Sequence, residues 1–214
     1  MSTLNFSASL GLICVLFAGV SFAGGCKAGK NEVGVAAEVV EDAYVWQEDP
    51  DTAFGLDDNR KLYAGYYDED GETGDEQDIY LYFDVSSIPA GATVTSAQLL
   101  IYISDTANTI AEDFIFSVED ADDSWTEGTL TWNNSPASTA VTTFDGPDDE
   151  AVGWLEIELP VSLIQGWVDY PGQNNGIGIM PQWNEADGDN DGIAVDSSEN
   201  GSGNKPTLII YYEE

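Results

Sequence analysis

Apolar and polar residues alternate along most of the chain after residue 38. In residues 79–83, for example, Ile79, Leu81 and Phe83 fall on one side of an extended chain, and Tyr80 and Tyr82 fall on the other. A period of two is typical of a β-strand that buries one face, and it does not fit an α-helix. The same alternation occurs at Leu99–Ile103, Phe114–Val118, Leu155–Leu159, Ile177–Ile179 and Leu208–Ile210. The pattern therefore predicts an all-β fold.

Turn-forming residues separate the alternating segments, and about ten short strands spaced in this way predict a jelly-roll β-sandwich. One segment differs. Leu163–Tyr170 places its apolar residues on one side of a helical turn and is followed by Pro171-Gly172, so we expect one short helix there. No internal repeat divides residues 36–214, and we expect them to form a single domain.

The charge balance excludes several partners and chemistries. The chain has 40 Asp and Glu against 5 Lys and Arg, a formal net charge of -35. Nucleic acid is a poor partner because its phosphates need clustered cations, and anionic membranes or glycans are repelled unless a divalent cation bridges them. The absence of histidine excludes a Ser-His-Asp triad and histidine-bound zinc. A high-salt habitat and calcium loading both account for the acidity, and the two are compatible.

The first 25 residues have the features of a signal peptide. Leu10–Ala23 is an apolar run of signal-peptide length, too short for a comfortable membrane span. Ala23-Gly24-Gly25-Cys26 resembles a lipoprotein box, in which the cysteine becomes the lipid-modified N-terminus. Cys14 lies in the leader, so Cys26 has no second cysteine with which to form an intramolecular disulfide once the leader is removed. We expect lipidation at Cys26 and a tether over residues 26–35; the alternative is secretion with a free or intermolecular thiol.

An acidic loop near the C-terminus has the residue order of calcium loops. In Asp187-Gly-Asp189-Asn-Asp191-Gly192 the spacing directs three carboxylates inward, and the glycine permits a tight turn. Carboxylate oxygens are the hard ligands that calcium prefers. Asp196 or Glu199 would complete the shell. We expect a structural calcium ion here; the alternative is a solvated acidic surface loop.

Three aromatic residues are candidates for stacking on sugar rings. Trp183 lies in a polar loop where no core position requires it, and Tyr66 and Tyr67 lie at a strand end beside the acidic run 68–78. A flat aromatic ring packs well on the apolar face of a pyranose, although a buried plug or a protein contact uses the same residue types. We expect Trp125 and Trp132 to be core or strand-edge residues that bracket a threonine-rich strand.

Several segments together resemble one known family. Trp125-Thr-Glu-Gly-Thr-Leu-Thr-Trp-Asn-Asn-Ser-Pro136 is similar to the central signature of the DNRLRE (disaggregatase-related) domains, which are grouped as carbohydrate-binding module family 96. Asp42-Ala-Tyr-Val45 resembles their opening strand, and Tyr80–Pro89 their strand that ends in "Phe-Asp-x-Ser-x-Ile-Pro". Pro206–Tyr212 resembles their final strand. The resemblance implies a jelly-roll, non-catalytic carbohydrate-binding domain.

We therefore expect a cell-surface protein whose partner is a polysaccharide or other glycan. The alternative is a structural or adhesive surface protein that binds proteins or assembles with its own copies. A glycosidase needs two carboxylates at a defined separation, and a chain with 40 acidic residues contains many such pairs by chance. The sequence nominates no catalytic pair, and we expect no enzyme activity.

Overall fold

The computed structural model describes residues 32–55, 60–67, 75–107, 114–147, 152–182 and 191–214, although not the side chains of residues 106, 107 and 191. Ten strands and one α-helix form in this part of the chain. The strands are β1 Glu32–Trp46, β2 Lys61–Tyr67, β3 Asp75–Phe83, β4 Thr93–Ala107, β5 Ile115–Ala121, β6 Ser138–Asp145, β7 Gly153–Glu158, β8 Ile177–Gln182, β9 Asp191–Asp196 and β10 Thr207–Glu213. The helix α1 spans Val161–Asp169, and the 3-10 turns η1 and η2 span Trp132–Asn134 and Pro171–Gln173.

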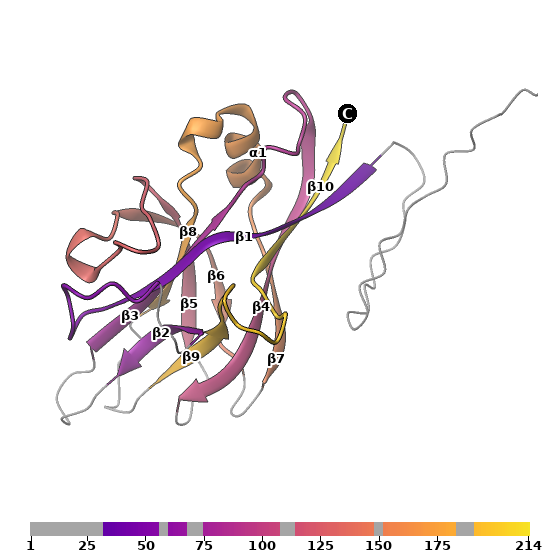
Figure 1. The fold of residues 1–214 in the computed structure, drawn as a ribbon. Coiled ribbons are helices and arrows are strands. Elements are labelled where there is room, and N and C mark those ends of the chain that lie inside the picture. Colours follow the sequence, from indigo (N-terminus) through magenta and orange to yellow (C-terminus); the bar gives the residue numbers. More distant parts are fainter. Residues whose placement is uncertain (1–31, 56–59, 68–74, 108–113, 148–151, 183–190) are drawn as a thin grey trace, which may run out of the picture. The chain divides into compact units, whose positions relative to one another are not determined.

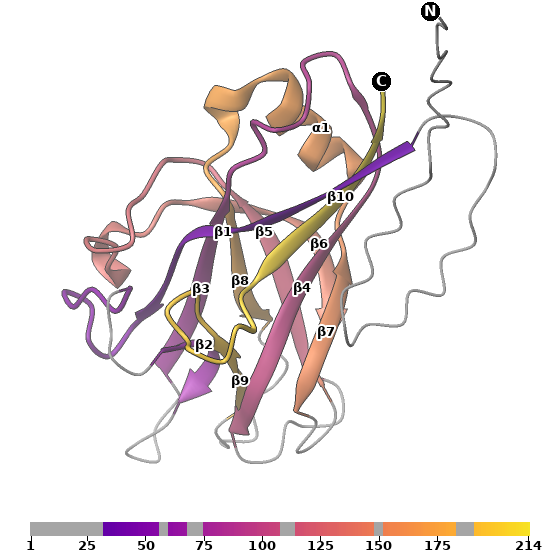
Figure 2. The ribbon, with the colours of Figure 1, turned by 45° about the vertical axis from the view of Figure 1, so that its right-hand side comes forward.

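Six strands close into a ring because β1 changes its partner halfway along its length. Residues 32–38 of β1 pair with β10, and residues 39–46 pair with β3, with a register shift between Val39 and Glu41. The ring continues from β3 through β2, β9 and β4 back to β10, and every pairing is antiparallel. Both ribbon views show β1 crossing the molecule beside β10 (Figures 1 and 2). Among the described residues β1 starts at Glu32.

The remaining strands extend this ring on two sides. β8 pairs with β3, β5 pairs with β8, and β6 pairs with β5, while β7 pairs with β4. The all-β class is confirmed, with ten strands and one α-helix in the described residues, although β1 and β4 are 15 residues long rather than short. The jelly-roll sandwich stays a prediction, because the strand pairing gives one connected sheet with a six-stranded ring inside it.

The main core consists of the residues that alternate in the sequence. Leu99, Ile101 and Ile103 of β4 are buried with the inward residues of β3, β5, β8 and β10. Helix α1 covers one end of the strands (Figure 2) and adds Ile164 and Trp167 to this core. Most strands thus bury alternate residues in one cluster, whereas β6 only packs the partly buried Val141 and Phe144 against it. The alternating segments together exclude water from a common core.

The glutamine Gln165 holds α1 against the start of β4. Its side-chain oxygen accepts a hydrogen bond from the Val94 amide at 2.8 Å, and its side-chain nitrogen donates to the Ala92 carbonyl at 3.1 Å. One polar side chain thus satisfies two backbone groups at the helix–sheet contact, where an unpaired group would cost free energy.

A second, smaller core lies under the segment with two tryptophans. Leu130 is buried with Ala43, Val45 and Tyr80, on the face of β1 and β3 opposite to the main core, and Trp125, Trp132 and Met180 pack around them. The stretch between the two tryptophans is not a strand, so that prediction was wrong. The amides of Thr129 and Leu130 bond back to the Thr126 carbonyl, and this turn lets Leu130 reach the sheet.

Two glycines with similar backbone conformations give a matched stability test. Gly176 and Gly91 have φ of 83° and 87°. A Cβ at Gly176 would lie 2.4 Å from the Leu81 carbonyl oxygen, whereas a Cβ at Gly91 would meet nothing within 4 Å. We expect Gly91→Ala to lower the unfolding free energy by about 1 kcal/mol, the cost of the left-handed conformation. Gly176→Ala should lower it by about 3 kcal/mol, because the β3 backbone must also move. Urea unfolding measures both, and equal losses would contradict the close packing of Gly176 on β3.

Candidate functional site

A row of aromatic rings leads from the main core to the surface beside β1. The Tyr44 ring stacks on Phe54, with centroids 4.6 Å apart, and meets Tyr63 edge-on at 5.2 Å. Trp46 lies 6.4 Å from Phe54 and 5.9 Å from Tyr67. Tyr44 is buried at one end of the row, whereas Tyr67 is 37% exposed at the other. The row therefore offers a supported aromatic surface at Tyr67, one of the predicted sugar-stacking residues.

Tyr66 and Tyr67 point to opposite faces of β2, because neighbouring side chains alternate along a strand. The Tyr66 ring lies 6.3 Å from Phe114 and faces Glu76 and Asp78. Burial, followed by the repulsion of these two carboxylates, raises the pKa of Tyr66 to about 12. The two tyrosines thus cannot form one continuous stacking surface.

The face near Tyr66 carries an acidic and polar cluster on β3, β5 and β8. Asp78 is buried, and burial together with the neighbouring Glu76 and Glu119 raises its pKa well above the usual range. The Ser117 hydroxyl donates to Glu119 at 2.9 Å and accepts from the Gln182 amide at 2.8 Å. These groups supply hydrogen-bond donors and acceptors, but they lie on the Tyr66 side of β2.

Trp125, Trp132 and Trp167 pack within the protein, which for Trp125 and Trp132 agrees with their expected core or edge positions. The Trp125 indole nitrogen donates to the Asn175 carbonyl at 2.9 Å, and its ring meets Tyr80 edge-on at 5.8 Å.

Trp154 differs from these three tryptophans. It is 40% exposed on β7, with its ring 5.5 Å from that of Tyr102 on β4. The exposure of Trp154 could not be predicted from the alternating pattern, because the pattern does not show which face of an edge strand is exposed.

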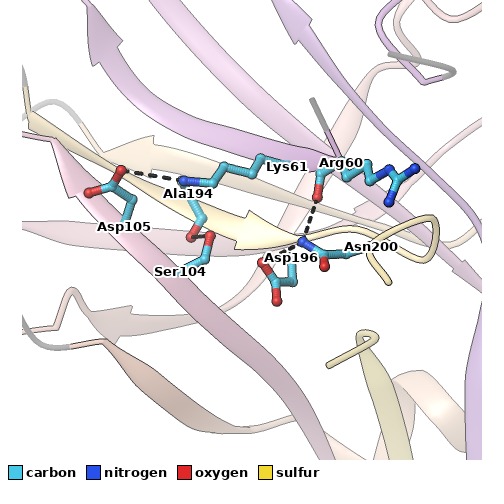
Figure 3. A network of polar contacts seen from close by, with 7 residues as sticks. All are labelled: Arg60, Lys61, Ser104, Asp105, Ala194, Asp196 and Asn200. Atoms are coloured by element: carbon cyan, nitrogen blue, oxygen red, sulfur yellow. Dashed lines mark hydrogen bonds and ion pairs between the residues drawn. The ribbon is translucent and has the colours of Figure 1, made fainter. Parts of the chain in front are cut away.

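The predicted metal ligand Asp196 lies at the end of β9 and is 4% exposed. Its carboxylate accepts hydrogen bonds from the side chains of Asn200 at 2.9 Å, Ser202 at 2.8 Å and Asn204 at 3.1 Å. Figure 3 shows the Asn200 amide between this carboxylate and the Arg60 carbonyl, to which it donates at 3.2 Å. These bonds tie the loop after β9 to the start of β2, which gives Asp196 a structural role. Its role as a metal ligand stays a prediction.

A different set of carboxylates meets at the second half of β1. Asp42 from β1, Glu127 from the segment with two tryptophans and Glu199 from the loop after β9 each place one oxygen within 4.8 Å of the others. Asp42 is 0% exposed, and its Oδ2 accepts a hydrogen bond from the Ser198 amide at 2.7 Å. Burial is the main cause that raises the pKa of Asp42 to about 6 and that of Glu127 to about 7, and the neighbouring carboxylates add to both. Among the described residues these three could hold a metal ion.

The other predicted site residues lie outside what the structure describes. Trp183, Asp187, Asp189 and Cys26 fall in the ranges not described, and for Asp191 only the backbone, at the start of β9, is given. Sequence reasoning named Glu199 as a ligand but missed Asp42 and Glu127. A signal for Asp42 existed, because it alternates with Tyr44 and Trp46 and so takes an inward position.

Comparison with known families gives one match. Residues 34–212 match the family described as carbohydrate-binding module family 96. No curated protein matches the chain. Within the described residues, no helix is long and apolar enough to cross a membrane.

The buried Asp78 should make stability depend on pH. Because this pKa is raised, the folded state keeps a proton on Asp78 over a pH range in which the unfolded state releases it. The stabilisation that this proton gives is complete below about pH 4 and is lost as the pH rises through the pKa of the folded state. Glu76, Glu119, Tyr66 and Tyr80 face it. We expect Asp78→Asn to be more stable relative to the parent protein at pH 8 than at pH 4, as measured by urea unfolding.

An exposed aspartate provides the control with the opposite sign. The Asp84 carboxylate accepts a hydrogen bond from the Ser86 amide at 2.8 Å, which lowers its pKa. The ionised Asp84 carboxylate therefore stabilises the folded state at neutral pH, and this stabilisation is lost in acid. We expect Asp84→Asn to be less stable than the parent protein at pH 8, and the difference to be smaller at pH 4. A parallel pH dependence for the two variants would contradict the buried proton on Asp78.

Proposed function

Since the chain belongs to carbohydrate-binding module family 96, we propose that it is a non-catalytic module that binds a polysaccharide at the cell surface. The family match over residues 34–212 is the observation that carries this proposal. The exposed end of the aromatic row supports it, because a ring backed by other rings keeps its orientation when a sugar stacks on it.

The net charge narrows the class of glycan. With a formal charge of -35, the protein repels uronate- or sulfate-rich chains at low ionic strength. A neutral polysaccharide meets no such barrier, and stacking on Tyr67 requires no charge on the sugar. We therefore propose a neutral glycan as the ligand, held by stacking at Tyr67 and by the predicted residue Trp183.

The proposal includes export, a lipid anchor and a calcium ion in the acidic loop. The apolar leader and the box before Cys26 support export and lipidation. The order of Asp187, Asp189 and Asp191, with Asp196 next along the chain, supports calcium binding in the loop. Calcium there would hold the loop that follows Trp183.

Self-assembly is the second candidate function, and an edge strand favours it. Among the described residues β6 pairs on one side, with β5, and it carries no charged residue from Ser138 to Phe144. An uncharged edge strand can pair with another chain. Sedimentation of the protein at increasing concentration distinguishes this function from glycan binding by a monomer.

Glycan binding is tested on an array of neutral and anionic polysaccharides, with calcium and again with chelator. We expect binding to a neutral polysaccharide and a five- to tenfold loss of affinity, on the order of 1 kcal/mol, in Tyr67→Ala, because one stacking ring is removed. Tyr170→Ala is the matched control, since Tyr170 is 63% exposed at the C-terminal end of α1 and is not one of the rings that form the aromatic row. Trp154→Ala tests the second surface aromatic. A folded protein that binds no glycan would contradict the proposal.

The lipid anchor is tested by Cys26→Ala. We expect the parent protein to partition into detergent and to carry the mass of attached acyl chains, because stable anchoring needs more than one chain. The variant should remain in the aqueous phase with an unmodified mass. Aqueous partition of both proteins, with a free thiol at Cys26 in the parent, would refute the anchor and support simple secretion.

A further inference from the structure

We propose that Asp42, Glu127 and Glu199 bind a calcium ion that joins three distant segments of the chain. The ligand oxygens of these side chains lie within 4.8 Å of one another. Two oxygens bound to one calcium ion at about 2.3–2.6 Å are separated by no more than about 5 Å. The three oxygens therefore already have the separations of a calcium shell.

A buried atom provides an independent reason to place a cation there. Asp42 Oδ1 is inaccessible to solvent and has no hydrogen-bond partner, and Glu127 Oε1 is in the same state. A buried carboxylate oxygen without a partner is unfavourable by several kcal/mol unless a donor or a cation satisfies it. Since Ser198 already occupies Asp42 Oδ2, a cation between the three carboxylates would satisfy the remaining oxygen.

No protein cation fills this place among the described residues. The ion pairs in the described part of the chain join Lys61 to Asp105 and Lys205 to Glu38, and neither pair includes Asp42, Glu127 or Glu199. Burial and mutual repulsion instead raise the pKa of both Asp42 and Glu127. A divalent ion removes this repulsion, because each carboxylate is then attracted to the ion more strongly than it is repelled by its neighbours.

The ligands favour calcium over magnesium. Calcium accepts six to eight oxygens in flexible geometry, whereas magnesium requires a compact octahedron, retains several waters and is usually held by one or two carboxylates. Here three carboxylates come from separate segments, and the exposed Glu199 leaves one side open to water. Water can complete a large calcium shell from that side.

Neighbouring contacts fix the position of two ligands. The Glu127 amide donates to Glu41 at 3.0 Å, and Gly55 approaches so closely that a Cβ there would lie 2.2 Å from the Glu127 carbonyl oxygen. The Ser198 hydroxyl donates to Glu199 at 2.5 Å. The ion would thus fasten the segment with two tryptophans and the loop after β9 to β1. The proposed site uses none of the loop carboxylates Asp187, Asp189 and Asp191, and it does not depend on the glycan-binding proposal.

Calcium binding is tested on the full exported chain after removal of metal with chelator. Thermal unfolding with 1 mM calcium should occur several degrees above that in chelator, and the shift with 1 mM magnesium should be smaller. Asp42→Asn and Glu127→Gln should abolish this shift or reduce it by more than half. Glu156→Gln, on the exposed face of β7, removes the same charge and should retain the full shift.

Two further variants identify which carboxylates are responsible. Glu199→Gln changes an exposed side chain and so should fold even if Asp42→Asn does not, and its calcium affinity by calorimetry should fall at least tenfold. The double variant Asp187→Asn, Asp189→Asn removes the predicted loop site and should retain the Glu199-dependent binding. A Glu199→Gln protein that binds calcium like the parent, or a parent protein with no calcium shift, would overturn the proposal.

Discussion

Strand β1 closes the ring and thereby brings together segments that are far apart in the chain. The strand pairs with β10 along residues 32–38 and with β3 along residues 39–46, so it joins the last strand of the chain to an early one. Asp42 lies in the second half, with no solvent exposure. A charged side chain is therefore buried at the point where the ring closes, and the segments carrying Glu127 and Glu199 meet there. The proposed calcium ion would stabilise this junction directly.

The two faces of β1 carry different features. One face of residues 42–46 bears Asp42, Tyr44 and Trp46, and so it carries both the acidic cluster and the start of the aromatic row. The other face bears Ala43 and Val45, which lie under the segment with two tryptophans. An ion that holds Glu127 would restrain this segment against β1. The calcium site and the aromatic surface would then be coupled through one rigid strand, because both are built on it.

Much of the fold could be predicted from the sequence, because a strand that buries one face has apolar residues at every second position. Residues such as Leu99, Ile101 and Ile103 alternate because they all enter one core. The helix was also predictable, within two residues of its observed start at Val161. The stretch from Thr126 to Thr131 was misread as a strand, because its threonines favour extended structure locally while Leu130 is drawn into a turn by its burial against Tyr80.

The acidic cluster could not be predicted in the same way, because its partners are remote in the chain. Asp42 and Ser198 are 156 positions apart, and the pairing that brings them together depends on the whole ring. A motif of adjacent aspartates is visible in the sequence, whereas a site with one carboxylate from each of three segments is not. The inward position of Asp42 was the one local sign, since an aspartate in a buried register needs a partner.

A crystal structure grown in calcium, with anomalous scattering used to locate the ion, tests the proposed calcium site most directly. If these carboxylates bind calcium, an anomalous peak will lie about 2.3–2.6 Å from oxygens of Asp42, Glu127 and Glu199. A lysine or arginine side chain in that place, or well-ordered carboxylates with water and no anomalous signal, would contradict it.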